Sequence, residues 1–314
     1  MSSRTIWIVA LFVILAAAVS FAGRSVTRET LSVSVEPEDK GVALEVDGQV
    51  LARYWHKDVP YKPYVQELNS PAGINVLRDN VPDHLHHHAL MYAIAVDGVN
   101  FWEEQKAPGV QKSLDVGDVV RVGKVRTAGI QENLDWINPR TNEILLKERR
   151  EIQVGPMKSE GATLLTWDSK LSVPPGRDSA TLTGSHYFGL GMRFVKSMDA
   201  IGEFCNADGK EGKIYRGEER LVRSNWCAYS AAVDGKPVTV AMFGDSSNPR
   251  HPTTWFTMAK PFAYVSATLN LHAEPLQIAV GKPLELRYGV AVWDGYVKAA
   301  AIQRLYDKWV ALAD

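Results

Sequence analysis

The amino-acid sequence predicts an all-β protein, a large antiparallel β-sandwich that ends in one α-helix. Runs in which apolar and polar residues alternate recur along most of the 314 residues, and such alternation is the pattern of half-buried strands. Two Asp-Gly pairs, at 97–98 and 234–235, lie between such runs and are typical of tight β-hairpin turns. Helical periodicity is clear only near the C-terminus, so few helices are expected.

The expected strands follow one another with short turns between them. The first, Leu31–Glu36, alternates strictly, and the second, Val42–Asp47, leads through Gly48 into a third. Strands are predicted at 31–36, 42–47, 50–54, 91–96, 99–102, 119–125, 143–154, 162–173, 227–233, 238–243, 261–271 and 284–293. Glycines and charges are frequent from Thr183 to Arg223, so we expect this stretch to form loops that carry a functional site.

One helix is predicted, from Tyr296 to about residue 312. Apolar residues recur there at spacings of three and four, as in Val297, Ala301, Leu305 and Trp309, which is the pattern of an amphipathic helix. We expect this helix to pack against the sheet and to cover one of its edges.

The first 22 residues have the pattern of a secretory signal peptide. Arg4 precedes an apolar run from Ile6 to Val19, and Ser20-Phe21-Ala22 places small residues before an expected cleavage site. An uncleaved N-terminal anchor is the alternative. Because no second long apolar run follows, the sequence predicts an exported, periplasmic or secreted protein with no membrane span in the mature chain, folded as one domain from 23 to 314.

Composition limits the partners and the chemistry. The formal net charge is −1, which gives no electrostatic reason to expect nucleic acid, so small molecules, glycans or proteins remain. Neither a nucleophile elbow, a phosphate loop, a dinucleotide glycine motif nor an HExxH motif is present. The two cysteines, Cys205 and Cys227, allow either a disulfide or two free thiols.

The segment Pro82–His88 is the strongest functional signal. It contains Asp83 and four of the eight histidines, and imidazole both binds metals and transfers protons near neutral pH. In an extended chain, His84, His86 and His88 would share one side. The bounding residues Asn80, Pro82 and Asp83 instead allow a loop that leads into the strand at 89–96. A metal site on His84 and His86, a metal-free acid/base site and a functionless cluster all remain open. A third metal ligand would have to come from elsewhere in the chain, with candidates His186, His251, Glu203, Asp135 and Asp199.

Two further segments carry residues suited to ligand binding. In 247–256, prolines on both sides fix the backbone around Arg250 and His251, and Trp255 could stack on a sugar face. In 185–194, His186 and Arg193 flank glycines that allow close backbone approach. Glu148, which alternates with Arg149 in an expected strand, is interpreted as a solvated cross-strand pair.

The two histidine segments together resemble one bacterial family. Asp83-His-Leu-His-His87 followed by Val99-Asn-Phe-Trp102 is similar to its first motif, and Asn248-Pro-Arg-His-Pro-Thr253 with Trp255 to its second. Gly189–Arg193 and Leu286–Gly295 also fit. This is the PmoA family, labelled methane oxygenase PmoA and otherwise of unknown function. The resemblance implies a role near sugar catabolism. The chain departs from it at His88, where an arginine is common, and at Phe256, where a histidine is common.

These signals predict an exported enzyme that acts on a sugar by histidine-assisted proton transfer, as an epimerase, lyase or hydrolase. The fold expected for it is a galactose-mutarotase-like supersandwich, which suits the strand number and the length. The alternative is a non-catalytic glycan-binding or envelope protein. A divalent metal such as zinc on His84 and His86 is possible. The predicted catalytic residues are His84, His86, His186 and His251, and the predicted substrate-binding residues are Asp83, His87, Trp102, Arg193, Arg250 and Trp255.

Overall fold

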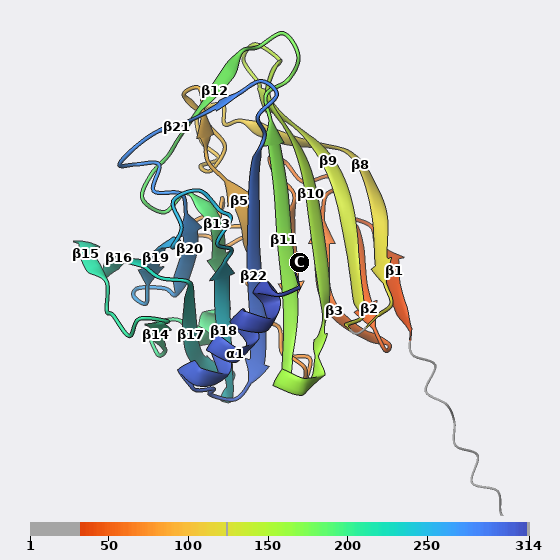
Figure 1. Ribbon diagram of the computed structural model, residues 1–314, viewed down its shortest axis with the longest axis vertical. Coiled ribbons are helices and arrows are strands. Elements are labelled where there is room, and N and C mark those ends of the chain that lie inside the picture. Colours follow the sequence, from red (N-terminus) through yellow and green to blue (C-terminus); the bar gives the residue numbers. More distant parts are fainter. Residues whose placement is uncertain (1–31, 124, 313–314) are drawn as a thin grey trace, which may run out of the picture. The chain divides into compact units, whose positions relative to one another are not determined.

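The computed structural model describes residues 32–123 and 125–312, which belong to one compact unit. The predicted signal peptide, residues 1–22, lies outside the described residues. Two large antiparallel sheets pack face to face, and one helix lies on the outer side of the second sheet (Figure 1). The predicted fold class, a large antiparallel β-sandwich with a C-terminal helix, is confirmed, and the expected galactose-mutarotase-like arrangement stays a prediction.

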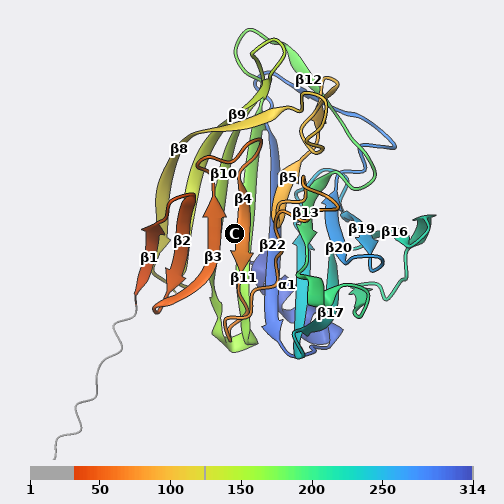
Figure 2. The same cartoon turned by 180° about the vertical axis from the view of Figure 1, so that it is seen from behind.

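The first large sheet has ten strands and carries the N-terminal hairpins (Figure 2). Every strand pair in it is antiparallel. In spatial order its strands are β1 (Val33–Pro37), β2 (Gly41–Val46), β3 (Gln49–Trp55), β4 (Tyr64–Leu68), β5 (Leu90–Ala93), β13 (Gly189–Arg193), β20 (Tyr264–Thr268), β19 (Thr254–Met258), β16 (Glu219–Arg223) and β15 (Lys213–Arg216).

The second large sheet has eight strands, and a small sheet of four lies at one end of the sandwich. The eight strands are β14 (Glu203–Asn206), β17 (Trp226–Val233), β18 (Lys236–Gly244), β22 (Leu284–Asp294), β11 (Ala162–Ser172), β10 (Glu143–Met157), β9 (Thr127–Asn138) and β8 (Val110–Arg121). The four are β21 (Leu276–Ala279), β12 (Ser179–Thr183), β6 (Ala95–Val96) and β7 (Val99–Asn100). Two short 3₁₀ turns cover Lys158–Glu160 and Lys196–Met198.

The predicted Asp-Gly turns are confirmed. Asp97 and Gly98 have φ angles of 47° and 80°, and Asp234 and Gly235 have 48° and 82°. Positive φ at both central residues matches the right-handed twist of the flanking strands. The pairs β6–β7 and β17–β18 are joined in this way.

The helix α1 (Ala299–Val310) covers a sheet face and not an edge, so this part of the prediction is wrong. Its buried side chains Ile302, Leu305 and Trp309 pack on the outer face of β17, β18, β22 and β11. Ala228, Ala241 and Ala291 are register partners in that face, and such small side chains let the helix approach the sheet. Both faces of these strands are therefore buried, which explains their continuous apolar runs.

Two predicted assignments differ from the structure around β8 and β9. The strand predicted at 119–125 is the end of β8, which begins at Val110, and β9 was not predicted. In β9 the buried Glu132 occupies a position that faces the core, so the expected apolar alternation is broken. The stretch 183–223, predicted as loops, also carries β13 to β16.

A buried ionic network lies between the two large sheets and is centred on Arg150. The Arg150 side chain is 0% exposed, and its Nε and Nη2 each donate to Glu148 at 2.9 Å. Its Nη1 donates to the Tyr54 hydroxyl at 2.9 Å. Glu148 also accepts hydrogen bonds from Trp136 and Ser169. Glu148 is therefore a core residue, and its interpretation as a solvated pair is wrong.

The two cysteines are free thiols. In the β14–β17 register Cys205 lies opposite Ala228 and Cys227 lies opposite Asn206. Because side chains that are one position apart point to opposite faces of a sheet, the two sulfur atoms are directed away from each other. Cys227 is buried and Cys205 is exposed. In the described part of the chain, no helix has the length and apolar character needed to cross a bilayer.

The Arg150 network predicts a large difference between two neighbouring arginines. Replacing Arg150 by alanine leaves Glu148 buried without its cation, so we expect the free energy of unfolding to fall by about 3–5 kcal/mol. Replacing the exposed Arg149 by alanine should change it by about 0.5 kcal/mol or less. Thermal unfolding of both variants measures the difference, and equal melting temperatures for the two would contradict the role of the network.

Candidate functional site

The histidine segment folds as two consecutive turns between β4 and β5. The backbone N–H of His84 donates to the Val81 carbonyl at 3.0 Å, and that of His87 to the His84 carbonyl at 2.9 Å. Of the two conformations considered for this segment, the structure has the loop that leads into β5 and not the extended chain. The turns bring His84, His86 and His87 together and direct His88 elsewhere.

Three imidazole rings form one cluster at the surface of the ten-stranded sheet. The rings of His84 and His87 stack with centroids 4.6 Å apart. The His86 ring lies edge-on, 4.7 Å from His87 and 5.7 Å from His84. Tyr264 of β20 packs on His87 at 4.7 Å, and Phe262 contacts His84 at 4.9 Å.

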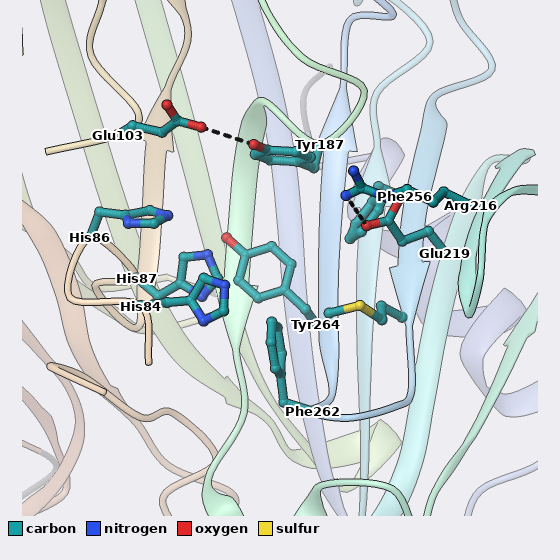
Figure 3. Close-up of a pocket in the computed structure, with 11 residues that line it drawn as sticks. His84, His86, His87, Glu103, Tyr187, Arg216, Glu219, Phe256, Phe262 and Tyr264 are labelled. Carbon is teal, nitrogen blue, oxygen red and sulfur yellow. Dashed lines mark hydrogen bonds and ion pairs between the residues drawn. The ribbon is translucent and has the colours of Figure 1, made fainter. Parts of the chain in front are cut away.

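This cluster forms one wall of a cavity of about 200 Å³. Figure 3 shows the histidines on one side of it, Arg216 and Glu219 on the other, and Glu103 with Tyr187 along a third border. The apolar part of the lining comes from β19 and the turn before β20. The full lining is His84, His86, His87, Glu103, Tyr187, Arg216, Glu219, Phe256, Met258, Phe262 and Tyr264.

Strand alternation places this cavity on the outer face of the ten-stranded sheet. Trp255 shares a cross-strand row with Ala267, Leu190 and Tyr92, and the Tyr92 ring contacts Trp136 of the eight-stranded sheet. That row therefore faces the inter-sheet core. Their neighbours along the strands, among them Phe256 and Met91, point to the opposite face.

A glycine makes room for the floor of the cavity. A Cβ atom on Gly191 would lie 2.1 Å from the Tyr264 hydroxyl and 2.6 Å from the Trp102 ring. Only glycine fits there, so the hydroxyl of Tyr264 can lie over the strand. Among the described residues this buried hydroxyl has no hydrogen-bond partner.

Two carboxylates reach the cavity from opposite sides. Glu103 accepts a hydrogen bond from the Tyr187 hydroxyl at 3.1 Å and one from Asn100 Nδ2 at 3.3 Å. Burial, followed by the charge of Glu103, raises the pKa of Tyr187 to about 12. Tyr187 is therefore a hydrogen-bond donor at neutral pH.

The second carboxylate, Glu219, is held between a cation and an imidazole. Arg216 Nη2 donates to its Oε1 at 2.7 Å, and His186 Nε2 lies 2.9 Å from its Oε2. Tyr215 stacks on the His186 ring with centroids 3.8 Å apart. His186 thus positions Glu219 from behind and is not itself part of the lining.

Burial keeps two of the clustered histidines neutral. Desolvation, with smaller contributions from Lys62 and His84, lowers the pKa of His86 to about 4. Desolvation and the neighbouring imidazoles hold the pKa of His87 far below its usual range. His84 differs in its surroundings, because Asp83 Oδ2 lies 3.1 Å from its Nδ1. The cavity thus contains two neutral imidazoles and one that faces a carboxylate.

His88 belongs to a buried ionic network and not to the cavity. Its Nδ1 lies 2.9 Å from Asp79 Oδ1, and its Nε2 lies 2.8 Å from Glu104 Oε1. Lys62 Nζ donates to the same Glu104 oxygen at 2.5 Å, and Tyr64 donates to Asp79 at 2.6 Å. Although burial alone would lower the pKa of His88, the two carboxylates raise it. A cation between two carboxylates is the role that an arginine would have at this position.

The structure brings some predicted site residues together and separates others. His84, His86 and His87 line the cavity, Asp83 contacts His84, and His186 acts through Glu219. Arg193 lies behind the lining, its guanidinium 3.5 Å from the Phe262 ring centre and 3.6 Å from Asp83. The fully buried Trp102 stacks on Phe188 and supports His87 from behind.

The second predicted segment, 247–256, lies outside the lining except for Phe256. Arg250 Nη1 donates to the backbone carbonyls of Leu269, Asn270 and Glu274, so it fixes a loop. Trp255 is 0% exposed, and its Nε1 donates to the Ser224 carbonyl, so it cannot stack on a ligand in the cavity. His251 is not a lining residue either.

The donor set does not form a metal site in this geometry. Within residues 32–123 and 125–312, no three His, Cys, Asp or Glu side chains are arranged to hold a metal ion. Of the predicted further ligands, Asp135 pairs with Lys147 and Asp199 lies near Arg193. The metal on His84 and His86 therefore stays a prediction.

Several lining residues were not predicted from the sequence. Glu103, Tyr187, Arg216, Glu219 and Tyr264 come from four separate parts of the chain. Glu103 directly follows the predicted segment 99–102, and Tyr187 directly follows His186. Their position next to predicted residues is the one available signal. Glu219 and Arg216 have none, because only the pairing of β16 with β19 brings their hairpin to the cavity.

Comparisons with known proteins give a family but no activity. The model of a "Family of unknown function (DUF6807)" matches residues 41–307, and no curated protein matches the sequence. The family match does not test the resemblance to the PmoA family, which stays a prediction.

Two solved structures are similar at low identity. The α-galactosidase from Lactobacillus brevis is 7% identical, with 85% of this chain and 40% of that chain covered and a TM-score of 0.42. The Slr1438 protein from Synechocystis sp. PCC 6803 is 9% identical, with 89% of this chain and 100% of that chain covered and a TM-score of 0.35. This chain thus spans about two fifths of the length of the α-galactosidase.

The His88 network predicts a pH-dependent contribution to stability. The pKa of His88 is raised in the folded state above its unfolded value of about 6.5. The stabilisation by protonated His88 is therefore complete below about pH 6.5 and is lost as the pH rises through the folded-state pKa. Replacing His88 by leucine should lower the melting temperature more at pH 6 than at pH 9.

Arginine at this position provides the matched control. Because arginine stays charged throughout this range, His88→Arg should keep most of the stability of the wild-type protein and should show no such loss between pH 6 and pH 9. Melting temperatures of the three proteins across this range measure the effect. A leucine variant with a pH-independent deficit would contradict a charged His88.

Proposed function

The chain belongs to the DUF6807 family, whose function is unknown, and we propose from its site that it acts on a sugar-sized, hydroxyl-rich molecule by proton transfer. The observation that carries this proposal is the convergence of three imidazoles, two carboxylates and a tyrosine hydroxyl on one cavity. Such groups perform general acid–base catalysis when they reach the same bound molecule.

The size and polarity of the cavity support a small polar ligand. Its volume of about 200 Å³ is below the ~300–1,000 Å³ of sites for drug-sized ligands, and one sugar ring suits it. The polar groups lie on several borders, whereas Phe256, Met258 and Phe262 form an apolar wall (Figure 3). A sugar ring has the same division between hydroxyl edges and apolar C–H faces.

The different surroundings of two histidines suggest their roles. His86 is neutral at pH 7 because its pKa is lowered to about 4, and it forms no ion pair among the described residues, so we assign it as the proton acceptor. His84 lies beside His86, with ring centroids 5.7 Å apart, and Asp83 Oδ2 lies 3.1 Å from its Nδ1. We assign His84 as the group that returns a proton to the same ligand.

Tyr187 and the two carboxylates bind and orient the ligand in this proposal. Tyr187 keeps its proton and hydrogen-bonds to Glu103, while Glu219 is fixed by Arg216 and His186. Proton removal at His86 and proton delivery from His84 on one ring is the chemistry of epimerisation, elimination or hydrolysis. Export, predicted from residues 1–22, would place this activity outside the cytoplasm.

The test is a proton-transfer assay that does not require the substrate to be known beforehand. The protein is incubated in D₂O with a panel of aldoses, keto-sugars and disaccharides, and ¹H NMR follows loss of C–H signals and new products. We expect turnover of at least one panel member. Replacing His86 by alanine should slow it by about 100-fold or more, because a positioned base contributes roughly 10²–10⁴-fold.

A matched histidine outside the cavity gives the control. His56 follows the end of β3 and is not a lining residue, so His56→Ala should leave the rate unchanged. Sugar binding that survives both His84→Ala and His86→Ala, with no turnover in the wild-type protein, would overturn the enzyme proposal. The protein would then be a glycan-binding protein.

A further inference from the structure

Glu103 is the lining carboxylate whose charge no cation balances. Among the described residues it forms no ion pair, and its two contacts are the neutral donors Tyr187 and Asn100. The other lining carboxylate, Glu219, is already paired with Arg216 at 2.7 Å and is held there by His186. The charge of Arg216 is therefore already balanced by Glu219, whereas Glu103 has no such partner.

The charges behind the lining also cancel one another. Lys62 is buried against Glu104 at 2.5 Å, and Glu104 with Asp79 also faces His88. Arg193 lies between Asp83 at 3.6 Å and Asp199 at 4.0 Å. The desolvated imidazoles of His86 and His87 add no positive charge at neutral pH. Of the two lining carboxylates, Glu103 is thus the one with no cation within ion-pair distance among the described residues.

We propose that the ligand of this cavity is an uncharged sugar and that Glu103 is the specificity-determining residue that rejects acidic sugars such as uronates. This inference rests on the proposed function, since it concerns the substrate class of the same site.

The hydrogen-bonding capacity of Glu103 fits an uncharged sugar. An ionised carboxylate has about four acceptor positions, and Tyr187 and Asn100 occupy two. The remaining positions can accept hydroxyl groups of a sugar, and hydrogen bonds to a charged acceptor are stronger than neutral ones. A ligand carboxylate offers no donor and adds a like charge. At about 4 Å such a repulsion weakens binding by about tenfold or more in a partly buried site.

The experiment compares three pairs of sugars that differ in one charge. Ligand-observed NMR titrations measure the dissociation constants of D-glucose and D-glucuronate, D-galactose and D-galacturonate, and D-mannose and D-mannuronate. In the wild-type protein we expect at least one neutral member to bind at least about tenfold more tightly than its acid. This difference should decrease at 0.5 M salt, because ions screen an open pocket.

Two glutamine variants distinguish an effect of the charge on Glu103 from an effect of the net charge of the protein. Glu103→Gln keeps the shape and removes the charge, so the preference for the neutral sugar should fall to about threefold or less. Glu218→Gln makes the same change of net charge at an exposed residue outside the lining and should leave the preference unchanged.

The outcomes distinguish this inference from the proposed function. A uronate that binds the wild-type protein as tightly as its neutral partner, or an unchanged preference in Glu103→Gln, overturns the role of Glu103 while the sugar site stands. Binding of none of the six sugars contradicts the sugar site itself and this inference with it.

Discussion

A row of buried ion pairs, Lys62–Glu104–His88–Asp79, holds the segment on which the rest of the site depends. His88 directly follows the turns that present His84, His86 and His87, and β5 begins two residues later. The network joins Lys62, two residues before β4, with the turns and with the segment after β7. Contacts among the three clustered imidazole rings contribute little stabilisation, so other residues must fix their geometry. The carboxylates on either side of His88 impose it.

The sandwich leaves part of the outer face of the ten-stranded sheet free for this site. The inner faces of both large sheets are closed by the common core, and α1 covers the outer face of β17, β18, β22 and β11 in the eight-stranded sheet. The outer face of the ten-stranded sheet around β19 and β20 is covered only by loops, and these loops carry the histidines, Glu103 and Tyr187. Loop residues placed on a rigid sheet are a common way to build a binding site. The cavity thus lies where loops, and neither the common core nor the helix, cover the sheet.

Local sequence patterns predicted those features of the fold that depend on neighbouring residues. The Asp-Gly turns, the alternation of most strands and the helical periodicity after Tyr296 each depend on a few neighbouring residues, and all are present in the structure. The histidine segment was identified because of its density, but its turns were not. Arg250 and Trp255 had suitable chemistry for ligand binding, yet one fixes a loop and the other faces the core. The place of Glu219 in the cavity could not be predicted from the sequence, because only long-range strand pairing brings it there.

His87 and His88 show how far the surroundings of a residue decide its chemistry. They are adjacent in the sequence and both are buried, His87 at 6% and His88 at 8% exposure. Burial acts on both in the same direction and disfavours the charged imidazolium. His88 contacts two carboxylates, which reverse the effect and raise its pKa. The rings that pack on His87 are imidazoles and aromatic rings, and they do not reverse the effect of burial, so its pKa stays far below the usual range. His88 therefore acts as a structural cation, whereas His87 is a neutral part of the cavity wall. The difference arises from Asp79 and Glu104, which contact His88.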